Sequence, residues 1–251
     1  METPFVAVIP ARLSSTRLPR KPLADIGGAP MVVRVAEQAA KSAASRVVVA
    51  TDSDEIMAVC QAHRIEVVKT KDSHPTGTDR LSELVSLLGL AQDEIVVNVQ
   101  GDEPFIPPQL INQVAQALSQ NHGCAISTAA VQIEDHFEVN NPNVVKVVCN
   151  LRSEALYFSR AGIPFARDVQ HTQFPYLRHL GIYAYRVHFL QDFANLPPAP
   201  IEQIEALEQL RALYNGYKIH VQVFHETPPP GIDTPEDLKL AQLKWAQLHQ
   251  K

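Results

Sequence analysis

Short apolar runs rich in β-branched residues alternate with segments of helical periodicity through the first half of the chain. The runs stand at residues 5–10 (FVAVIP), 46–52 (RVVVATD), 65–69 and 94–99 (EIVVNV), and the helical patterns at 30–43, 53–63, 78–88 and 107–119. Nearly continuous apolar strands are typical of a parallel sheet that is covered on both faces. The alternation therefore predicts an α/β fold with a doubly wound, mostly parallel sheet, in which ligands bind at the carboxyl ends of the strands.

The second half of the chain is less regular. Strand patterns stand at 124–133, 144–150, 179–186 and 218–224, and helical patterns at 201–214 and from Thr234 to about 248. We see neither an internal repeat nor a linker, so we expect a single domain over 1–251. Within it, a segment of about residues 135–220 is predicted to be an insertion after which the chain returns to the main sheet. Its aromatic and aliphatic residues suit a core or a partner surface equally well.

Composition excludes several classes of protein. The 251 residues are 45% hydrophobic and 20% charged, as is usual for a globular chain. A formal net charge of −5 makes the chain a poor general binder of nucleic acid. The three cysteines lack metal-site spacing, and no apolar run reaches the ~20 residues of a membrane helix. With no signal-peptide pattern, these features lead us to expect a cytoplasmic protein with reduced thiols and no membrane partner.

A basic loop follows the first predicted strand. Residues 10–22 (PARLSSTRLPRKP) contain Arg12, Arg17, Arg20 and Lys21 together with three hydroxyl side chains. Backbone N–H groups and guanidinium forks of such a loop bind phosphate groups. A solvated charged loop is the alternative, but four cations at the carboxyl end of a strand favour a triphosphate site. The glycine patterns of P-loop kinases and of dinucleotide-binding dehydrogenases are both missing from the sequence, which argues against those classes.

A second cluster, residues 76–80 (TGTDR), stands between a strand and a helix. Thr78 or Asp79 suits the N-cap of that helix. Gly77 equally suits a backbone position that a ligand approaches closely. The residues themselves leave both interpretations open.

A third cluster follows the strand that ends near residue 99. Asp102 comes after Gly101 in the string NVQGDEP, where an α/β enzyme places a metal ligand. Asp233, in the string GIDTP, is a second candidate of the same kind. Sites for Mg²⁺ use one or two carboxylates together with phosphate oxygens and water, so both residues suit a complex of metal and nucleotide. The alternative is that each aspartate is a turn residue, and for Asp233 alone that interpretation is equally good.

The strings VIPARLSSTRLPRKPL, TGTDR, NVQGDEP and GIDTPEDL occur in this order, with YFSR, RHLGIYAYR and LEQLR in the later part of the chain. Together they resemble the 3-deoxy-manno-octulosonate (Kdo) cytidylyltransferases, or CMP-Kdo synthetases, from residue 5 to about residue 243. Two positions depart from the pattern, because the family usually has Gly where this chain has Arg20, and commonly Pro where it has Gly162. The resemblance implies that CTP and Kdo give CMP-Kdo and pyrophosphate, in lipopolysaccharide biosynthesis.

The resemblance also implies a sheet like that of the nucleotide-diphospho-sugar transferases, a requirement for Mg²⁺, and a homodimer with contacts in the inserted segment. The implied catalytic residues are Arg12, Lys21, Asp102 and Asp233, of which Asp102 and Asp233 bind the metal. The implied nucleotide-binding residues are Ala11, Arg12, Leu13, Ser14, Arg17, Lys21, Thr76, Gly77, Asp79 and Arg80.

The acidic sugar needs hydrogen-bond donors for its carboxylate. The resemblance implies a sugar site formed by Gln100, Arg160, His179, Tyr185, Glu208 and Gln209. On the residues alone, Tyr185 suits packing within a strand, and His179 suits a structural histidine. Glu208 and Gln209 lie off the apolar stripe of the predicted helix, so exposure to solvent accounts for them equally well.

Three other functions share some of these features. The nearest is a cytidylyltransferase for another acidic sugar such as sialic acid, but NVQGDEP and RHLGIYAYR favour Kdo. A glycosyltransferase that uses a nucleotide sugar also places aspartates after a strand, and it releases no pyrophosphate. A non-catalytic nucleotide-binding scaffold is disfavoured because the phosphate cations and the metal carboxylates are all present.

Overall fold

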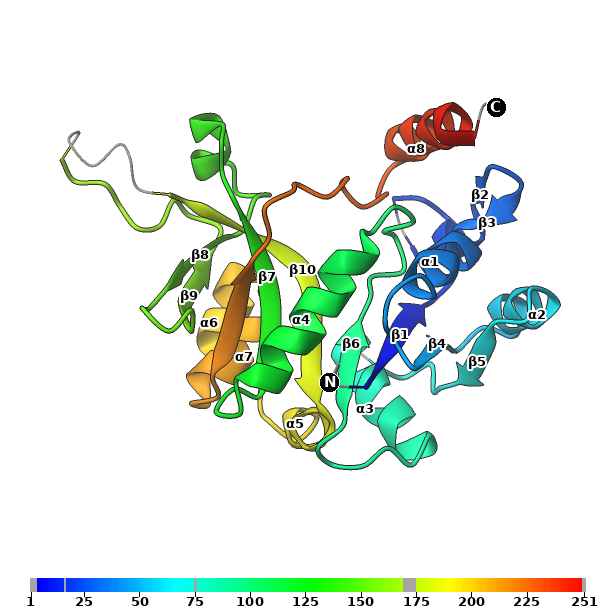
Figure 1. Cartoon of the computed structure of the whole chain (residues 1–251), viewed down its shortest axis with the longest axis horizontal. Coiled ribbons are helices and arrows are strands. Elements are labelled where there is room, and N and C mark those ends of the chain that lie inside the picture. Colours follow the sequence, from blue (N-terminus) through cyan, green and yellow to red (C-terminus); the bar gives the residue numbers. More distant parts are fainter. Residues whose placement is uncertain (1–3, 16, 75, 169–174, 250–251) are drawn as a thin grey trace.

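The computed structural model describes residues 4–15, 17–74, 76–168 and 175–249. Within these residues, nine strands form one mixed sheet in the order β11-β7-β10-β6-β1-β4-β5, with β8 attached to β10 and β9 to β8 (Figure 1). The strands are β1 (Phe5–Ala11), β4 (Arg46–Thr51), β5 (Glu66–Lys69), β6 (Ile95–Asn98), β7 (Ile126–Gln132), β8 (Lys146–Cys149), β9 (Ala155–Ser159), β10 (Leu177–Arg186) and β11 (Ile219–Val223). The predicted α/β fold with a mostly parallel sheet is thereby confirmed.

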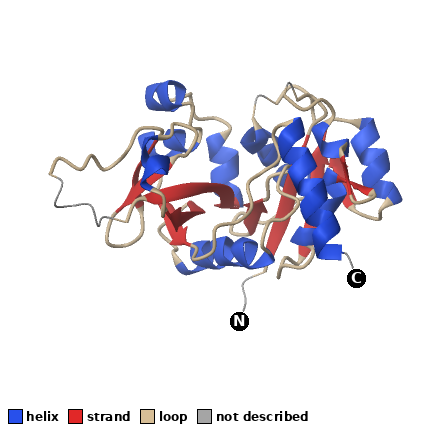
Figure 2. Cartoon of the chain, turned by 90° about the horizontal axis from the view of Figure 1, so that it is seen from above, coloured by secondary structure: helices blue, strands red, loops and turns tan. Residues whose placement is uncertain are grey.

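Helices cover both faces of this sheet, as Figure 2 shows from above. One face packs on α1 (Met31–Ala39), α2 (Asp54–Ala62) and α4 (Pro108–Gln120), and the other on α3 (Gly77–Leu87), α5 (Val187–Phe193) and α7 (Gln209–Tyr214). Because successive strand residues point to opposite faces, Ala7 and Ile9 of β1 belong to the first core, whereas Val6 and Val8 belong to the second. Such two-sided burial explains why the strand sequences are almost entirely apolar.

Strand β10 lies in the middle of the sheet, antiparallel to both β6 and β7. The segment 135–220, expected as an insertion, therefore contributes a central strand. It also contributes β8, β9 and the helices α5, α6 (Pro200–Glu205) and α7. Tyr185 of β10 and Phe189 of α5 are buried in the second core, so these aromatic residues pack inside the chain.

The predicted continuous helix over residues 201–214 is wrong. The chain breaks into α6 and α7 because Ala206 has a φ of 50°, in the left-handed region that ends a helix. The break leaves Ile204 83% exposed, although its spacing placed it on the predicted apolar stripe. It also turns Gln209 inward, where it is buried. A pair between Glu202 and Arg211, with a hydrogen bond of 2.9 Å, holds the two short helices together.

The remaining elements are short or terminal. A hairpin of β2 (Asp25–Ile26) and β3 (Ala29–Pro30) precedes α1, a 3-10 turn covers Lys21–Leu23, and another covers His136–Asn140. Helix α1 ends at Ala39, before the predicted end at residue 43.

The final helix α8 (Pro235–His249) packs on β2. The guanidinium carbon of Arg34, from α1, lies 3.9 Å from the ring centroid of Trp245 in α8. In the part of the chain that the structure describes, no helix has the length and apolar character to span a membrane.

Candidate active site

A cleft of about 380 Å³ opens at the carboxyl ends of the parallel strands β1 and β6. Its lining comes from three separate stretches of the sequence: Pro10, Ala11, Arg12, Ser14, Ser15, Arg17, Lys21 and Pro22, then Gln100, Gly101 and Asp102, and finally Asp233. The structure therefore brings the basic loop together with both candidate metal-binding aspartates. Leu13 of the same loop instead packs its side chain against the first core.

Close backbone packing joins the loops after β1 and β6. The N–H of Val99 donates to the carbonyl oxygen of Val8 at 2.8 Å. At Gly101, an added Cβ would stand 2.7 Å from the carbonyl oxygen of Pro10, a distance that only glycine permits. Gly101 therefore has a structural reason to precede Asp102 in NVQGDEP.

The loop before α8 crosses above the sheet and reaches the same point (Figure 1). The N–H of Ile232 donates to the carbonyl oxygen of Asp102 at 2.9 Å, and Gly231 lies beside the Asp102 carboxylate. Asp237 accepts hydrogen bonds from the N–H groups of Asp233 and Thr234, at 3.0 and 2.9 Å, so this turn is also the start of α8. These backbone hydrogen bonds, the first of them the largest cause, lower the pKa of Asp237.

Lys21 connects the two aspartates. Its Nζ donates to Asp102 Oδ2 at 2.6 Å and to Asp233 Oδ1 at 2.9 Å. Burial by itself would lower the pKa of Lys21, but the charge and hydrogen bond of Asp102, with a smaller contribution from Asp233, outweigh it and raise the pKa. Lys21 is therefore an ammonium ion that neutralises part of the charge of the two carboxylates.

The other three cations of the loop have different environments. The Arg17 guanidinium lies 3.1 Å from Asp233 Oδ1 and is largely exposed. Arg20 pairs with Glu55 on α2, outside the set of residues that line the cleft. Its φ of 57° lies in the left-handed region, which gives a physical reason for glycine at this position in the resembling family. Arg12 has no ion pair within the described residues, so its fork is free to bind an anion in the cleft.

Asp102 and Asp233 suit a hard divalent cation that also binds phosphate. Among the residues described, no three His, Cys, Asp or Glu side chains gather as a metal site. Two carboxylates beside a cationic loop are the donor set with which proteins hold Mg²⁺ on a nucleotide. The neighbouring Glu103 does not extend this set as a carboxylate, because burial and then the charge of Asp102 raise its pKa to about 8.

The segment 76–80 forms the N-terminus of α3. Thr76 is the N-cap residue, since its Oγ1 accepts a hydrogen bond from the Asp79 N–H at 3.2 Å and donates one to Asp79 Oδ2 at 2.7 Å. Gly77 lies near Pro10, because an added Cβ would stand 3.8 Å from the proline Cγ. The predicted N-cap at Thr78 or Asp79 is therefore wrong, because both residues lie inside the helix that Thr76 caps, and the segment adjoins the end of β1. Whether it also binds the nucleotide base stays a prediction.

Arg80 is only 2% exposed and is held by the protein itself. Its Nη2 donates to Asp52 Oδ2 at 2.6 Å, and its Nη1 donates to Thr70 Oγ1 and to the Lys71 carbonyl oxygen. This buried pair ties α3 to the ends of β4 and β5. These contacts hold Arg80 in the fold, and its contact with the nucleotide stays a prediction.

Gln100 links the cleft to β10, the strand that carries two of the predicted sugar-site residues. Its Nε2 donates to the Gly181 carbonyl oxygen at 2.8 Å, at the point where the pairing of β10 with β7 shifts register. His179 lies two residues earlier, with its ring against those of Phe158 and Tyr183, and it hydrogen-bonds Thr128 at 2.9 Å. Burial lowers the pKa of His179 to about 3, so the ring is neutral at physiological pH.

Tyr185, Glu208 and Gln209 line a second, much smaller cavity of about 20 Å³ with Thr78 and Tyr183. The Glu208 Oε1 and Gln209 Nε2 atoms are buried without a hydrogen-bond partner within the described residues. Such unsatisfied polar atoms are rare unless a water or a ligand completes them. Burial raises the pKa of Glu208 despite its hydrogen bonds from threonines, one of which runs from Thr78 at 2.7 Å.

Arg160 lies at the end of β9 and is occupied by backbone carbonyl groups. Its guanidinium donates to the carbonyl oxygens of Glu205, Pro142 and Ala206, at 2.7, 3.0 and 3.3 Å. The buried Lys146 donates in turn to the Arg160 carbonyl oxygen at 2.6 Å. The structure thus places Arg160 in a network that holds three loops together, and two of its five N–H donors remain outside these three bonds.

Sequence reasoning did not single out several residues at these sites. Thr128 and Phe158 hold His179, and Asn98 contributes an unpartnered Oδ1 beside Tyr185 within the part of the chain that is described. Their signal is weak because each occupies an ordinary strand position. Asn98 is the exception, since a buried amide at the end of an apolar strand is unusual enough to be noticed.

Known proteins resemble this chain over nearly its whole length. A cytidylyltransferase family model matches residues 6–219. The chain is 65% identical over 236 residues to the 3-deoxy-manno-octulosonate cytidylyltransferase of Polynucleobacter necessarius subsp. necessarius, covering 94% of this chain and 93% of that protein. It is 63% identical, with the same coverage, to the protein of the same name from Polynucleobacter asymbioticus.

Solved structures are also similar to this chain over nearly its whole length. A CMP:2-keto-3-deoxy-manno-octonic acid synthetase complexed with CTP superposes with a TM-score of 0.91 and 39% sequence identity, over 98% of this chain and 99% of that one. A cytidylyltransferase from Leptospira borgpetersenii superposes with a TM-score of 0.60 at 15% identity, over 96% and 86% of the two chains. The second likeness concerns the fold alone.

Proposed function

Because this chain belongs to the family of 3-deoxy-manno-octulosonate cytidylyltransferases, we propose that it activates Kdo with CTP for lipopolysaccharide biosynthesis. The products are CMP-Kdo and pyrophosphate. The single observation that carries this proposal is the cleft in which Arg12 and Lys21 meet Asp102 and Asp233. It combines anion-binding cations with metal-binding carboxylates at the edge of the sheet where α/β enzymes bind nucleotides.

The reaction is an in-line substitution at phosphorus. The anomeric hydroxyl oxygen of Kdo forms a bond to the α-phosphorus of CTP, the bond to the bridging oxygen breaks, and pyrophosphate leaves with that electron pair. The hydroxyl proton passes to water. Catalysis of such a transfer depends mainly on positioning and on neutralising charge. Arg12 and Lys21 supply positive charge for the triphosphate and for the leaving pyrophosphate, and the backbone N–H groups near Ala11 and Ser14 supply oriented donors.

Asp102 and Asp233 would hold Mg²⁺ in this scheme. When bound, the metal would neutralise phosphate charge and favour ionisation of the attacking hydroxyl. The protein's own contribution is to fix the two carboxylates at the mouth of the cleft, through Gly101 on one side and the turn at Ile232 on the other.

Kdo is preferred here to sialic acid as the substrate, since the related proteins at 63–65% identity carry the name of the Kdo enzyme. The sugar is proposed to lie towards β10, where Gln100 contacts Gly181 and the His179 ring contacts Tyr183. Tyr185, Glu208 and Gln209 line the small cavity beside Tyr183. The cavity of about 20 Å³ at the unsatisfied polar atoms of Glu208 and Gln209 has room for one water or one polar group of the sugar.

Pyrophosphate release tests the proposal directly. The protein is incubated with CTP and Mg²⁺, and the reactions contain Kdo, sialic acid or no sugar. Release with Kdo only is expected. Release with sialic acid only would keep the phosphate site but discard the sugar assignment, and no release from a folded protein that binds CTP would contradict an enzymatic function.

We propose in addition that the protein is a homodimer with contacts in the segment 135–220. Phe137, Leu156 and Ile204 of this segment are 89%, 62% and 83% exposed, and exposed apolar side chains are a usual sign of a partner surface. Sedimentation equilibrium of the wild type and of a Leu156→Glu variant tests this, with a monomeric wild type as the contradicting result.

The free thiols of the three cysteines support a cytoplasmic location, which fractionation of the native host would examine.

A further inference from the structure

We propose that Lys21 is a built-in counter-cation of Asp102 and Asp233, which makes the binding of a divalent metal conditional on the nucleotide. The inference rests on the proposed function and extends it to the order of events in the site. Lys21 was predicted from the sequence to bind the triphosphate. The structure shows its ammonium group on the two candidate metal ligands instead, at 2.6 and 2.9 Å.

The observed contact of Lys21 with the aspartates competes in part with its predicted contact with the triphosphate. An ammonium has three N–H donors, and two of them are directed at the aspartates. The Lys21 side chain is 16% exposed and those of Asp102 and Asp233 are 29% and 43% exposed, so solvent screens this contact only in part. A divalent cation that approaches the same carboxylate oxygens therefore meets a positive charge already in place, and its affinity is lowered.

The protein offers few further ligands that could offset the repulsion between Lys21 and the metal. The described residues supply no third carboxylate, histidine or cysteine to this site, so the remaining ligands of the metal must be water or phosphate oxygens. Moving the aspartates away from the lysine is also restricted, because the Ile232 N–H is bonded to the Asp102 carbonyl oxygen and Asp237 holds the backbone of Asp233. The free protein is thus expected to bind the metal weakly.

A bound triphosphate is expected to remove this obstacle to metal binding. It brings several negative charges into the cleft, which Arg12, Arg17 and Lys21 line, and a charge-assisted contact to phosphate draws the flexible lysine from the aspartates. The carboxylate oxygens are then free at the moment when phosphate oxygens complete the metal's coordination. Thermodynamic linkage makes the effect reciprocal, so that the metal also strengthens binding of the nucleotide.

The test is equilibrium binding of Mn²⁺, measured through the electron paramagnetic resonance signal of the free ion with neither nucleotide nor Kdo present. Lys21→Met removes the charge while keeping a long side chain. It is expected to bind Mn²⁺ about tenfold or more tightly than the wild type, which is within the usual range of coupling between sites. Loss of a lysine with a purely structural role would not raise the affinity for the metal.

Two further variants make the result specific. Arg20→Met removes one positive charge from the adjacent position, but Arg20 pairs with Glu55 and is expected to leave Mn²⁺ affinity unchanged. Lys21→Arg keeps the charge and is expected to retain the weak binding of the wild type. Circular dichroism and thermal unfolding establish that each variant is folded.

The inference is overturned if Lys21→Met binds Mn²⁺ no more tightly than the wild type, or if Arg20→Met shows the same gain. It is also overturned if Lys21→Arg behaves like Lys21→Met. The measurement contains no sugar and no turnover. A protein that failed to use Kdo would therefore contradict the proposed function while leaving this result intact, and the two failures are distinguishable.

Discussion

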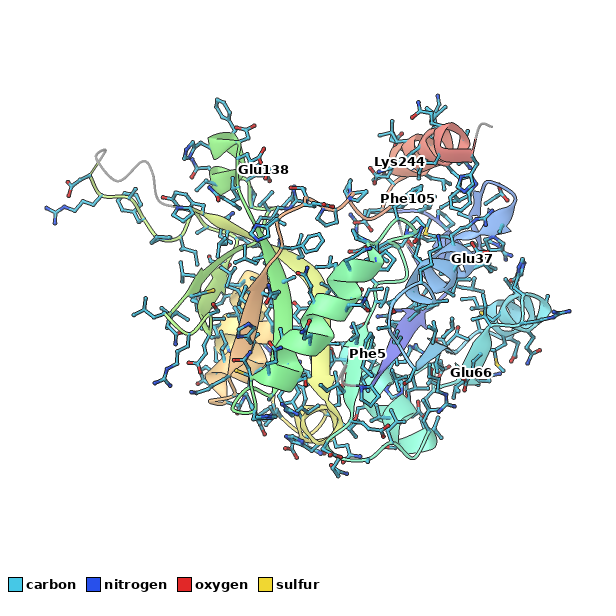
Figure 3. The ribbon with its side chains drawn as sticks, viewed as in Figure 1. Phe5, Glu37, Glu66, Phe105, Glu138 and Lys244 are labelled. Carbon is cyan, nitrogen blue, oxygen red and sulfur yellow. The ribbon has the colours of Figure 1, made fainter. Side chains whose placement is uncertain are left out.

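The N–H of Ile232 donates a hydrogen bond of 2.9 Å to the carbonyl oxygen of Asp102. This bond joins two loops that are far apart in the sequence, and it places the turn containing Asp233 against the end of β6. The position of one candidate metal ligand is thereby fixed relative to the other by backbone contacts. The same turn continues into α8, where Lys244 lies 5.1 Å from the ring centroid of Phe105 (Figure 3).

Replacing Asp102 by asparagine removes one of two charged ligands while keeping the size of the side chain. We expect pyrophosphate release at saturating Mg²⁺ to fall by roughly 10²-fold or more, because the lost charge stabilises the developing phosphate charge through the metal. Asp93→Asn, which changes an exposed aspartate outside the set of cleft residues, is the matched control. Nearly normal turnover of Asp102→Asn would remove Asp102 from the metal site.

Arg12 is the cation of the cleft that has no protein partner in the described chain, so its loss leaves no carboxylate unpaired. Arg12→Ala is therefore expected to lower the rate of pyrophosphate release by on the order of 10²–10³ with little effect on thermal stability. Arg12→Lys restores the charge but not the fork that binds two phosphate oxygens, and only partial recovery is expected. Steady-state kinetics in CTP and a thermal melt of each variant check both statements, and equal activity of Arg12→Ala and wild type would refute them.

Gly101 permits the close approach of the loops after β1 and β6. In Gly101→Ala, the added Cβ would stand 2.7 Å from the Pro10 carbonyl oxygen, which is backbone and cannot move alone. We expect a loss of about 1–3 kcal/mol in the free energy of unfolding, together with lower activity. Gly123→Ala adds the same methyl group where no described atom lies within 4 Å, and it should unfold like the wild type in urea. Equal stability of the two variants would contradict the packing argument.

Arg80 and Asp52 form a buried ion pair, whereas Arg46 and Glu66 form an exposed one. Arg80→Met is expected to lower the free energy of unfolding by about 3 kcal/mol or more, because it leaves Asp52 without its partner. Arg46→Met removes an arginine of an ion pair with 39% and 41% exposed side chains, and about 0–1 kcal/mol is expected. Urea denaturation of both variants measures the contrast, and similar losses would show that burial of the Arg80 pair is unimportant.

The pKa of His179 is lowered from 6.5 to about 3 by burial. As the pH falls below about 6.5, the unfolded chain binds a proton at this residue and the folded protein does not, so stability is lost down to about pH 3. Between about pH 7.0 and pH 5.5 this contributes about 1 kcal/mol of destabilisation. His179→Gln should lose correspondingly less stability over that interval, as measured by urea unfolding at both pH values. His122→Gln, at an exposed position, is the control, and an unchanged pH dependence of His179→Gln would argue against a buried neutral histidine.

Local sequence patterns predicted most of the sheet and the helices that cover it. The apolar runs became β1, β4 and β6, where burial on both faces leaves little place for polar residues, and the edge strand β5. The helix starts at Ser53 and near residue 77 followed from capping chemistry, although the cap of α3 is Thr76 and not Thr78 or Asp79. The break at Ala206 was missed, since an alanine with positive φ is imposed by the packing around it and leaves no sign in the sequence.

The charged residues of the candidate site could be predicted from the sequence, because cations and carboxylates that directly follow buried strands are seldom needed for the fold itself. The residues that these side chains contact could not be predicted. Only the tertiary structure decided that Lys21 lies on Asp102 and Asp233, that Arg80 is held by Asp52, and that the Arg160 fork is taken by carbonyl groups. Each of these contacts joins residues that lie far apart along the chain, and no local propensity encodes such a distance. The sequence thus determined which groups can perform the chemistry, while long-range packing decided which of them face the cleft and which hold the fold together.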